Sequence, residues 1–186
     1  MKAVLLNSGG IDTLAAAQML KEQGHELHSL FIGMGQPNQV LALIASKKIA
    51  DAYCSSHFEF IIPGEWSVSS PNAPAGGISI PYLTGVVFLM GCVYARKIGV
   101  EYIVSAVKGT HVEAFKPTLL ALQKANSIIP VIIIPITPLE NKSDAEVYEM
   151  VKNNPLLKET VSCAWSPPCG VCKKCLDRKA REIDVA

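Results

Sequence analysis

The first residues suited to chemistry lie near the start of the chain, directly after a short apolar run at residues 3–6. They are two hydroxyls, two glycines and a carboxylate: Ser8, Gly9, Gly10, Asp12 and Thr13. Adjacent glycines let a backbone turn sharply and approach a ligand, and the N–H groups at the start of a helix attract an anion. The hydroxyls can donate to phosphate oxygens, while the carboxylate either caps the helix or holds a nucleotide through Mg²⁺. The segment therefore predicts a site for nucleotide phosphates, with an ordinary side-chain-capped turn as the alternative.

Two common nucleotide-binding motifs do not fit this segment. No Gly-Lys-Ser/Thr follows the glycines, so it is not the lysine-bearing P-loop. Only two glycines are present and they are adjacent, so it is not the dinucleotide fingerprint either. The pattern predicts a phosphate loop of a different kind.

A second chemical cluster lies near the other end, where four of the six cysteines are grouped: Cys163, Cys169, Cys172 and Cys175. Four thiolates at this short spacing match a tetrahedral structural zinc site that has no open position for substrate. Gly170 permits the tight turn that brings neighbouring sulfurs to one metal. Disulfides and an iron–sulfur cluster are the alternatives.

Further candidates follow other predicted strands. Lys108 and His111 come after a core strand, whose carboxyl end faces the ligand crevice of a parallel sheet. Lys108 is suited to stabilise a phosphate or a substrate carboxylate, and His111 to move a proton from ammonia. The alternatives are a solvated loop lysine and a histidine that caps the next helix. Gln36 and Lys142 are comparable candidates for nucleotide binding and for catalysis.

For the other two cysteines and the other three histidines, structural roles are expected rather than chemical ones. Cys54 and Cys92 stand in apolar settings, where small buried side chains are expected. His25, His28 and His57 show no partner in the sequence, so ordinary surface or strand-edge roles are expected for them.

Short Val/Ile/Leu runs alternate with helical patterns along the chain. Strands are predicted at residues 3–6, 27–32, 58–62, 102–107 and 131–134, and helices at 12–23, 38–52, 82–98, 112–126 and 142–153. Such alternation predicts an α/β fold with a doubly wound parallel sheet, covered by helices on both faces. Residues 63–79 are rich in Gly, Pro, Ser and Asn and are expected to form a long loop near the site. Residues 1–161 are predicted to be the nucleotide-binding unit and residues 162–186 a small zinc-binding appendage.

Composition narrows the class of protein. A chain of 186 residues is long enough to bury one core, and 49% of its residues are hydrophobic. The net charge of +1 disfavours a nucleic-acid partner and favours a small-molecule substrate. The apolar start is too short for a signal peptide or a membrane span, so a cytoplasmic protein without membrane contact is expected.

The segment LNSGGIDT resembles the Ser-Gly-Gly-x-Asp-Ser/Thr signature of the ATP pyrophosphatase, or PP-loop, family. Members of that family cleave ATP between the α- and β-phosphates and adenylate a carbonyl or carboxylate, which nitrogen or sulfur then attacks. The resemblance implies that the serine, both glycines, the aspartate and the threonine of this loop grip the pyrophosphate. The physical logic agrees, because in-line attack on the α-phosphate requires the outer phosphates to be held still.

Together with the cysteine cluster, the whole chain resembles the 7-cyano-7-deazaguanine synthase family, and CGVCKKCLDRKA is closely similar to its zinc segment. Gly35-Gln36, Lys116-Pro117 and Pro138-Leu139 with Lys142 stand near comparable residues of that family. The family converts 7-carboxy-7-deazaguanine to the nitrile with ATP and ammonia, on the route to queuosine. The resemblance implies ATP, Mg²⁺ and Zn²⁺ as cofactors, a deazapurine carboxylate and ammonia as substrates, and a homodimer.

Some positions depart from that family's pattern. Asn38 and Leu41 stand where the family usually has histidine and glutamate, and residues 81–84 replace its Pro-Gly-Arg-Asn. A first competing hypothesis is therefore a divergent paralogue that joins a deazaguanine to another amine, such as a protein, or activates another carboxylate. A second is a tRNA thiolation enzyme of the same superfamily, and a third is a non-catalytic nucleotide-binding interaction module.

Overall fold

The computed structural model describes residues 1–64, 68–69, 78–79, 83–109 and 133–183, together with residues 117, 121 and 124. The central element is a five-stranded sheet in the order β3-β2-β1-β6-β7. Its strands are β1 (Lys2–Leu6), β2 (Glu26–Gly33), β3 (Ser56–Ile61), β6 (Tyr102–Val104) and β7 (Ile134–Ile136). Every pair in this sheet is parallel, which confirms the predicted fold class.

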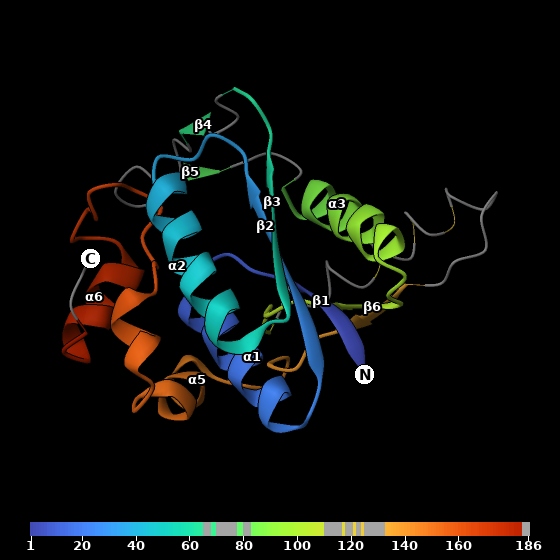
Figure 1. The fold of residues 1–186 in the computed structure, drawn as a ribbon. Coiled ribbons are helices and arrows are strands. Elements are labelled where there is room, and N and C mark those ends of the chain that lie inside the picture. The colour runs from blue at the N-terminus through green and yellow to red at the C-terminus, as the bar shows by residue number, and fades with distance from the viewer. Residues whose placement is uncertain are drawn as a thin grey trace.

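Helices cover both faces of the sheet, as Figure 1 shows. On one face lie α1 (Ile11–Glu22), α2 (Gln39–Tyr53), α5 (Asp144–Val151) and α6 (Lys173–Ala180), with a 3₁₀ turn η1 (Pro155–Glu159). On the other face lies α3 (Leu83–Lys97), drawn in green. Parallel strands joined by helical crossovers need this double cover because both faces of such a sheet are apolar.

Alternate residues of β1 divide the core into two clusters. Ala3 and Leu5 pack with α1 and α5, whereas Val4 and Leu6 pack with α3. Helix α3 approaches the sheet closely at Gly91, where a Cβ atom would lie 3.0 Å from Leu6 Cδ2. The continuous apolar run that predicted a doubly covered strand is thus explained by a core on each side of it.

Several predicted boundaries are wrong. The last strand is Ile134–Ile136 rather than residues 131–134, and it contains Pro135, which an edge strand tolerates because one side of its ladder is unpaired. The strand predicted at 102–107 ends at Val104, and the helix predicted from residue 142 begins at Asp144. Ser143 explains that start, because its side chain caps α5 by accepting from the Glu146 N–H in a capping box.

The segment predicted as a plain loop at residues 63–79 contains two short strands. Strands β4 (Val68–Ser69) and β5 (Ile78–Ser79) pair in an antiparallel manner. The helix predicted at residues 112–126 falls almost wholly outside the described residues. In the part of the chain that the structure describes, every helix is too short or too polar to cross a membrane.

Candidate functional site

The strand order reverses between β1, the central strand of the sheet, and its neighbour β6. Residues 7–10 leave the carboxyl end of β1, and residues 105–108 leave the carboxyl end of β6. Ligands of open parallel sheets bind beyond this edge, at the point where strand order reverses. The fold therefore brings the predicted phosphate loop and Lys108 to the same edge of the sheet, where folds of this kind have their ligand crevice.

The backbone of the phosphate loop is shaped by Gly9, whose φ is +74°. A Cβ atom at this position would lie 2.5 Å from the carbonyl oxygen of Ala42, so only glycine fits both the conformation and the space. Gly10 is the N-cap residue of α1, and no side chain caps the helix there. The alternative of a turn capped by Ser8 or Asp12 is therefore wrong, and no side chain occupies the place where the first-turn N–H groups could bind an anion.

The side chain of Asn7 fixes the backbone of the phosphate loop, a role that the sequence did not predict. Its side chain is only 2% exposed, and its Oδ1 accepts from the Gly9 N–H at 3.0 Å. Its Nδ2 donates to Ser29 Oγ and to the carbonyl oxygen of Ser46, both at 2.9 Å. Since those partners belong to β2 and α2, the loop is tied to two other elements before any ligand binds.

Two hydroxyls of the loop lie together. Ser8 Oγ is 3.0 Å from Thr13 Oγ1, with Ser8 exposed and Thr13 buried. Hydroxyls beside the start of α1 can donate to an anion that approaches the helix N-terminus. The geometry accommodates the phosphate-binding role predicted for both residues.

Lys108 links three segments at the crevice. Its Nζ donates to Asp12 Oδ1 at 2.7 Å and to Asp144 Oδ1 at 2.5 Å, and its side chain is 16% exposed. Burial alone would lower the pKa of Lys108, but the hydrogen bonds and charges of Asp12 and Asp144 outweigh that effect and raise the pKa. In turn, the hydrogen bond from Lys108 lowers the pKa of Asp144. Lys108 is therefore a fixed cation beside the phosphate loop rather than a proton acceptor.

The other predicted residues are placed differently. Lys142 Nζ pairs with Glu146 Oε1 at 3.4 Å on the exposed side of α5, so it does not join the ion-pair cluster of Lys108. Gln36 lies in the loop after β2, where its Oε1 accepts from the Met34 N–H at 2.8 Å. His111 lies outside the described residues.

The four clustered cysteines converge as predicted. Their sulfurs all lie within 4.8 Å of one another, and Cys163 Sγ is 3.6 Å from Cys169 Sγ and 4.0 Å from Cys172 Sγ. Sulfur ligands of one tetrahedral zinc, each about 2.3 Å from the metal, lie about 3.8 Å apart. In a four-iron cluster each cysteine binds a different iron, so the sulfurs stand farther apart. The spacing fits one tetrahedral metal ion.

The local turn and its charges also suit a metal. Gly170 has φ +72° between two of the cysteines, as the predicted tight turn requires. Backbone N–H groups of Val171 and Cys172 lower the pKa of Cys169 to about 6, while burial raises the pKa of Cys175 to about 12. A bound cation would favour the thiolate form of all four side chains.

The two remaining cysteines differ from the cluster. Cys54 and Cys92 are half-buried free thiols. Burial raises the pKa of Cys54 to about 12 and also raises the pKa of Cys92. Both are therefore poor nucleophiles, in agreement with the packing role expected for them.

The chain around the start of the cysteine segment contacts the phosphate loop and the loop before α2. The Val161 N–H donates to the Gly9 carbonyl oxygen at 2.9 Å, and Asn38 Nδ2 donates to the Cys163 carbonyl oxygen at 2.7 Å. Buried Arg178 of α6 donates to Thr160 Oγ1 at 2.9 Å. The first two contacts join residues more than a hundred positions apart, so no local pattern could have signalled them.

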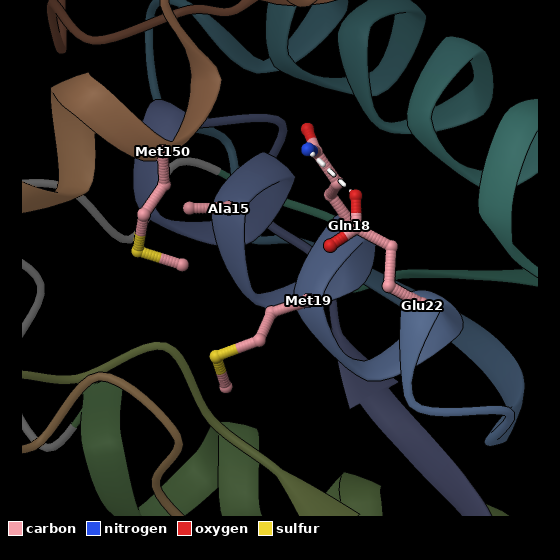
Figure 2. A pocket seen from close by; sticks show the side chains of 5 residues that line it. All are labelled: Ala15, Gln18, Met19, Glu22 and Met150. Carbon is pink, nitrogen blue, oxygen red and sulfur yellow. Dashed lines mark hydrogen bonds between the residues drawn. The ribbon is translucent and has the colours of Figure 1, made fainter.

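A separate cavity of about 200 Å³ lies between α1 and α5. Figure 2 shows its lining side chains, which are Ala15, Gln18, Met19, Glu22 and Met150. Its α1 residues lie between Ala15 and the end of that helix at Glu22, and none of them belongs to the phosphate loop. The cavity is therefore distinct from the crevice at the carboxyl ends of β1 and β6.

Comparison with known proteins settles the family. A family model described as queuosine biosynthesis protein QueC matches residues 2–182. The chain belongs to the QueC family. A 7-cyano-7-deazaguanine synthase from Sulfurovum sp. (strain NBC37-1) is 25% identical over an alignment that covers 100% of this chain and 94% of that protein. QueC membership makes the chain an ATP-dependent enzyme of the synthetase or ligase kind.

Solved structures show the same fold at lower identity. NMN synthetase from Francisella tularensis superposes with a TM-score of 0.55 at 15% identity, covering 99% of this chain and 78% of the other. The U34-tRNA thiolase NcsA from Methanococcus maripaludis, solved with its [4Fe-4S] cluster, gives 0.54 at 15% identity, covering 97% and 80%. These likenesses establish the architecture of the QueC chain and not its substrate.

Proposed function

We propose that this QueC-family chain adenylates 7-carboxy-7-deazaguanine with ATP and uses ammonia to form 7-cyano-7-deazaguanine. The observation that carries the proposal is the phosphate loop at the reversal of strand order, with the cation of Lys108 held 2.7 Å from Asp12. The names of the curated relatives point to the same substrate class.

In the proposed reaction, a carboxylate oxygen of the substrate attacks the α-phosphorus of ATP and pyrophosphate leaves. Ammonia then attacks the acyl carbon, and AMP leaves as the nitrogen loses a proton, which gives the amide. The amide oxygen then attacks the α-phosphorus of a second ATP, pyrophosphate leaves and the nitrogen loses a proton; loss of AMP and of the remaining N–H proton gives the nitrile. Pyrophosphate is released beside the N–H groups of α1, which stabilise its charge.

Each residue of the loop has a role in this proposal. Ser8, Gly9, Gly10 and Thr13 bind the pyrophosphate portion of ATP through backbone amides and hydroxyls. The Asp12 carboxylate would hold Mg²⁺, which neutralises phosphate charge when it is bound. Lys108 supplies a permanent positive charge, because its raised pKa keeps it protonated.

Three further residues are proposed to take part in the reaction. Gln36 is proposed to approach the nucleotide from the loop after β2, which ends at the same sheet edge. Lys142 is proposed to contact substrate when it leaves Glu146, its partner at 3.4 Å. His111, three positions after Lys108 in the sequence, is proposed to take the proton from ammonia.

The cysteine site is proposed to hold Zn²⁺ in a structural role. Four sulfurs within 4.8 Å of one another fill a tetrahedral coordination sphere, so no position remains for substrate. We accordingly propose residues 162–186 as a metal-stabilised appendage to the nucleotide-binding unit of residues 1–161. The reduced thiols also suit the cytoplasm, where disulfides are rare.

The proposal is tested with zinc-replete protein, ATP, Mg²⁺, 7-carboxy-7-deazaguanine and ammonium, with AMP release and product mass as readouts. We expect two AMP per nitrile, and Asp12→Ala is expected to reduce turnover by at least about a hundredfold. Glu149→Gln is the matched control, since Glu149 pairs with Lys152 on the exposed side of α5. A folded protein that binds ATP but releases no AMP with this substrate would reject the substrate assignment.

A second candidate keeps the adenylation and changes the acceptor. Asn38 occupies a position where the resembling family usually has histidine, and here its amide is bonded to the Cys163 carbonyl oxygen. A paralogue that transfers a deazaguanine to a protein amine, or activates another carboxylate, is therefore the competing proposal. AMP release with a different carboxylate, or a substrate-sized mass increase on a protein amine, would distinguish it from nitrile formation.

The tRNA thiolation hypothesis is less well supported. Such chemistry commonly uses a reactive cysteine near the crevice, whereas burial raises the pKa of both Cys54 and Cys92. A non-catalytic module would retain its cellular function after Asp12→Ala, so a complementation assay of that variant in cells can decide between a module and an enzyme.

We also propose a homodimer built on α3. Leu89 and Val93, one turn apart on this helix, are 49% and 54% exposed. Apolar side chains at this spacing can form a shared contact between two copies. Light scattering is expected to give a dimer mass for the wild type and a monomer mass for Val93→Lys. A wild-type monomer at micromolar concentration would contradict the dimer without affecting the proposed reaction.

A further inference from the structure

Asp144 is the one carboxylate at the described part of the crevice that no sequence pattern indicated. It is the first residue of α5, where an acidic side chain is ordinarily explained by the helix dipole. Here, however, its Oδ1 accepts from Lys108 Nζ at 2.5 Å, across 36 positions of sequence. An ammonium that is 16% exposed needs such partners, because an unpaired charge removed from water is strongly unfavourable.

The backbone of Asp144 is held firmly by its neighbours. The Ser143 capping box fixes the first turn of α5, with Glu146 Oε2 accepting from the Ser143 N–H at 2.8 Å. The turn before it bonds to the loop after β6, since the Gly109 N–H donates to the Glu140 carbonyl oxygen at 3.2 Å. The segment from β7 to α5 thus contacts both the backbone beside Lys108 and the ammonium itself.

The two carboxylates on Lys108 differ in what else they must do. Asp12 lies in the phosphate loop and, in the proposed function, turns to Mg²⁺ when the nucleotide binds. Asp144 lies outside that loop, and its second oxygen faces Lys173, which is 3.6 Å away and 81% exposed. Asp144 is therefore able to keep hold of Lys108 while Asp12 changes partner.

We propose that Asp144 is a positioning residue, which keeps the ammonium of Lys108 directed at the phosphate loop as ATP binds. This inference rests on the proposed function. Without Asp144, Lys108 would keep only Asp12 as a partner among the described residues. In the proposed function the Asp12 carboxylate is recruited by Mg²⁺ when the nucleotide binds. The ammonium would then explore other rotamers, and ordering it again would weaken nucleotide binding.

The test compares wild type, Asp144→Asn, Asp144→Glu and the matched control Glu149→Gln by calorimetric titration with ATP and Mg²⁺. We expect Asp144→Asn to raise the Kd for ATP about threefold to tenfold and the control to leave it unchanged. Asp144→Glu is expected to restore most of the affinity. In a Lys108→Met background, Asp144→Asn should have no further effect, because it acts only through Lys108.

A second measurement follows Lys108 itself, by its rate of acylation with an amine reagent and mass spectrometry. Losing one carboxylate partner should make Lys108 about tenfold more reactive in Asp144→Asn than in wild type. Wild-type affinity and reactivity in Asp144→Asn, or additive effects of the two substitutions, would overturn the positioning role. If wild type binds no ATP, the proposed function fails, and Lys108 reactivity alone decides whether Asp144 positions that side chain.

Discussion

Two regions of the molecule turn at a glycine with positive φ, but in different surroundings. They are the phosphate loop, residues 7–13, and the cysteine segment, residues 162–183. Gly9 has φ +74° and Gly170 has φ +72°, so each turn depends on a left-handed glycine. A Cβ atom on Gly9 would meet the Ala42 carbonyl oxygen at 2.5 Å, whereas none of the described atoms lies within 4 Å of the same atom on Gly170. One turn is enclosed by the fold and the other is open.

The difference indicates what holds each region in place. The phosphate loop is tied to β2 and α2 through Asn7, so the sheet forms it without a ligand. In the cysteine segment, Val171 and Leu176 are 62% and 52% exposed, and Ile183 is the one buried apolar residue other than cysteine in the part that the structure describes. A segment with so little core of its own needs the metal to define its turn.

The largest effect is expected from loss of the metal site. Cys163→Ser removes the sulfur of a residue that is 3% exposed and should lose most of the roughly 10 kcal/mol that a four-cysteine zinc site can supply. Trypsin is then expected to cleave α6 rapidly, since that helix carries Lys173, Lys174, Arg178 and Lys179, while the lysines of α1 and α2 stay protected. Zinc content by atomic emission should fall below one ion per chain.

Cys54→Ala is the matched control for that prediction, because Cys54 is half-buried and outside the cluster. It should keep the zinc and the resistance of α6. If Cys163→Ser also keeps a resistant α6, contacts such as that of Arg178 with Thr160 hold the segment, and the contrast between the two regions disappears.

The next largest effect is expected from Gly9→Ala. The new Cβ must displace the Ala42 carbonyl of α2 in addition to the roughly 1–2 kcal/mol of a left-handed alanine. Gly24→Ala separates these contributions, because Gly24 has φ +78° and no described atom within 4 Å of an added Cβ. Chemical denaturation should show Gly9→Ala as the more destabilised, with weaker ATP binding only in that variant. Equal losses of folding free energy in the two variants would mean that the contact with the Ala42 carbonyl adds nothing to the cost of Gly9→Ala.

The contrast between the regions also explains what the sequence could predict. Ser8, Gly9, Gly10, Asp12 and Thr13 are nearly contiguous, and the four cysteines span 13 positions, so short-range patterns sufficed for both sites. The end of β7 was missed because a proline ordinarily ends a strand, whereas β7 continues through Pro135 at the edge of the sheet. Parallel strands and two-sided helices followed from the alternation of apolar runs, which is a property of whole segments.

Residues whose role depends on distant partners were missed. Asn7 bonds to residues 22 and 39 positions away, and Asp144 to a lysine 36 positions away. The role of Lys142 stays a prediction, and in the structure its i,i+4 partner is Glu146, at 3.4 Å. The partner that each of these side chains takes depends on which residues the fold brings close, and a sequence pattern does not show this.

A smaller loss of stability is expected from Asn7→Ala, which keeps Gly9 and Gly10 but removes the side chain that accepts from the Gly9 N–H. The Gly9 N–H loses its acceptor in a buried setting, which costs about 1–3 kcal/mol of folding free energy. The control Asn153→Ala alters an exposed residue and should change stability by less than about 0.5 kcal/mol. Urea denaturation measures both. A neutral Asn7→Ala would show that the sheet alone, without this side chain, forms the phosphate loop.

The smallest effect is a pH dependence of stability caused by His57, which shares the Ser29 hydroxyl with Asn7. His57 Nδ1 lies 2.9 Å from Ser29 Oγ, the same hydroxyl that accepts from Asn7. Burial lowers the pKa of His57, partly offset by the charge of Glu59, whereas the unfolded chain has the ordinary value of about 6.5. As pH falls below that value, the unfolded state binds a proton that the folded state does not, so stability decreases toward acid. This loss should be absent from His57→Gln.

The measurement is the change in unfolding free energy between about pH 7 and about pH 5.5, a window around the ordinary histidine pKa, for wild type, His57→Gln and the control His25→Gln. His25 contacts the amino terminus at 3.1 Å, at the opposite end of the strands from the phosphate loop. Subtracting the variant from the wild type removes the titration of carboxylates, which is common to both. A larger loss toward acid in His57→Gln than in wild type would mean that protonated His57 is stabilised by Glu59, 3.9 Å from its Nε2, and the sign of the predicted pH dependence would be reversed. The predicted sign therefore depends on burial outweighing that carboxylate, a balance that Glu59→Gln should shift toward a still lower pKa of His57.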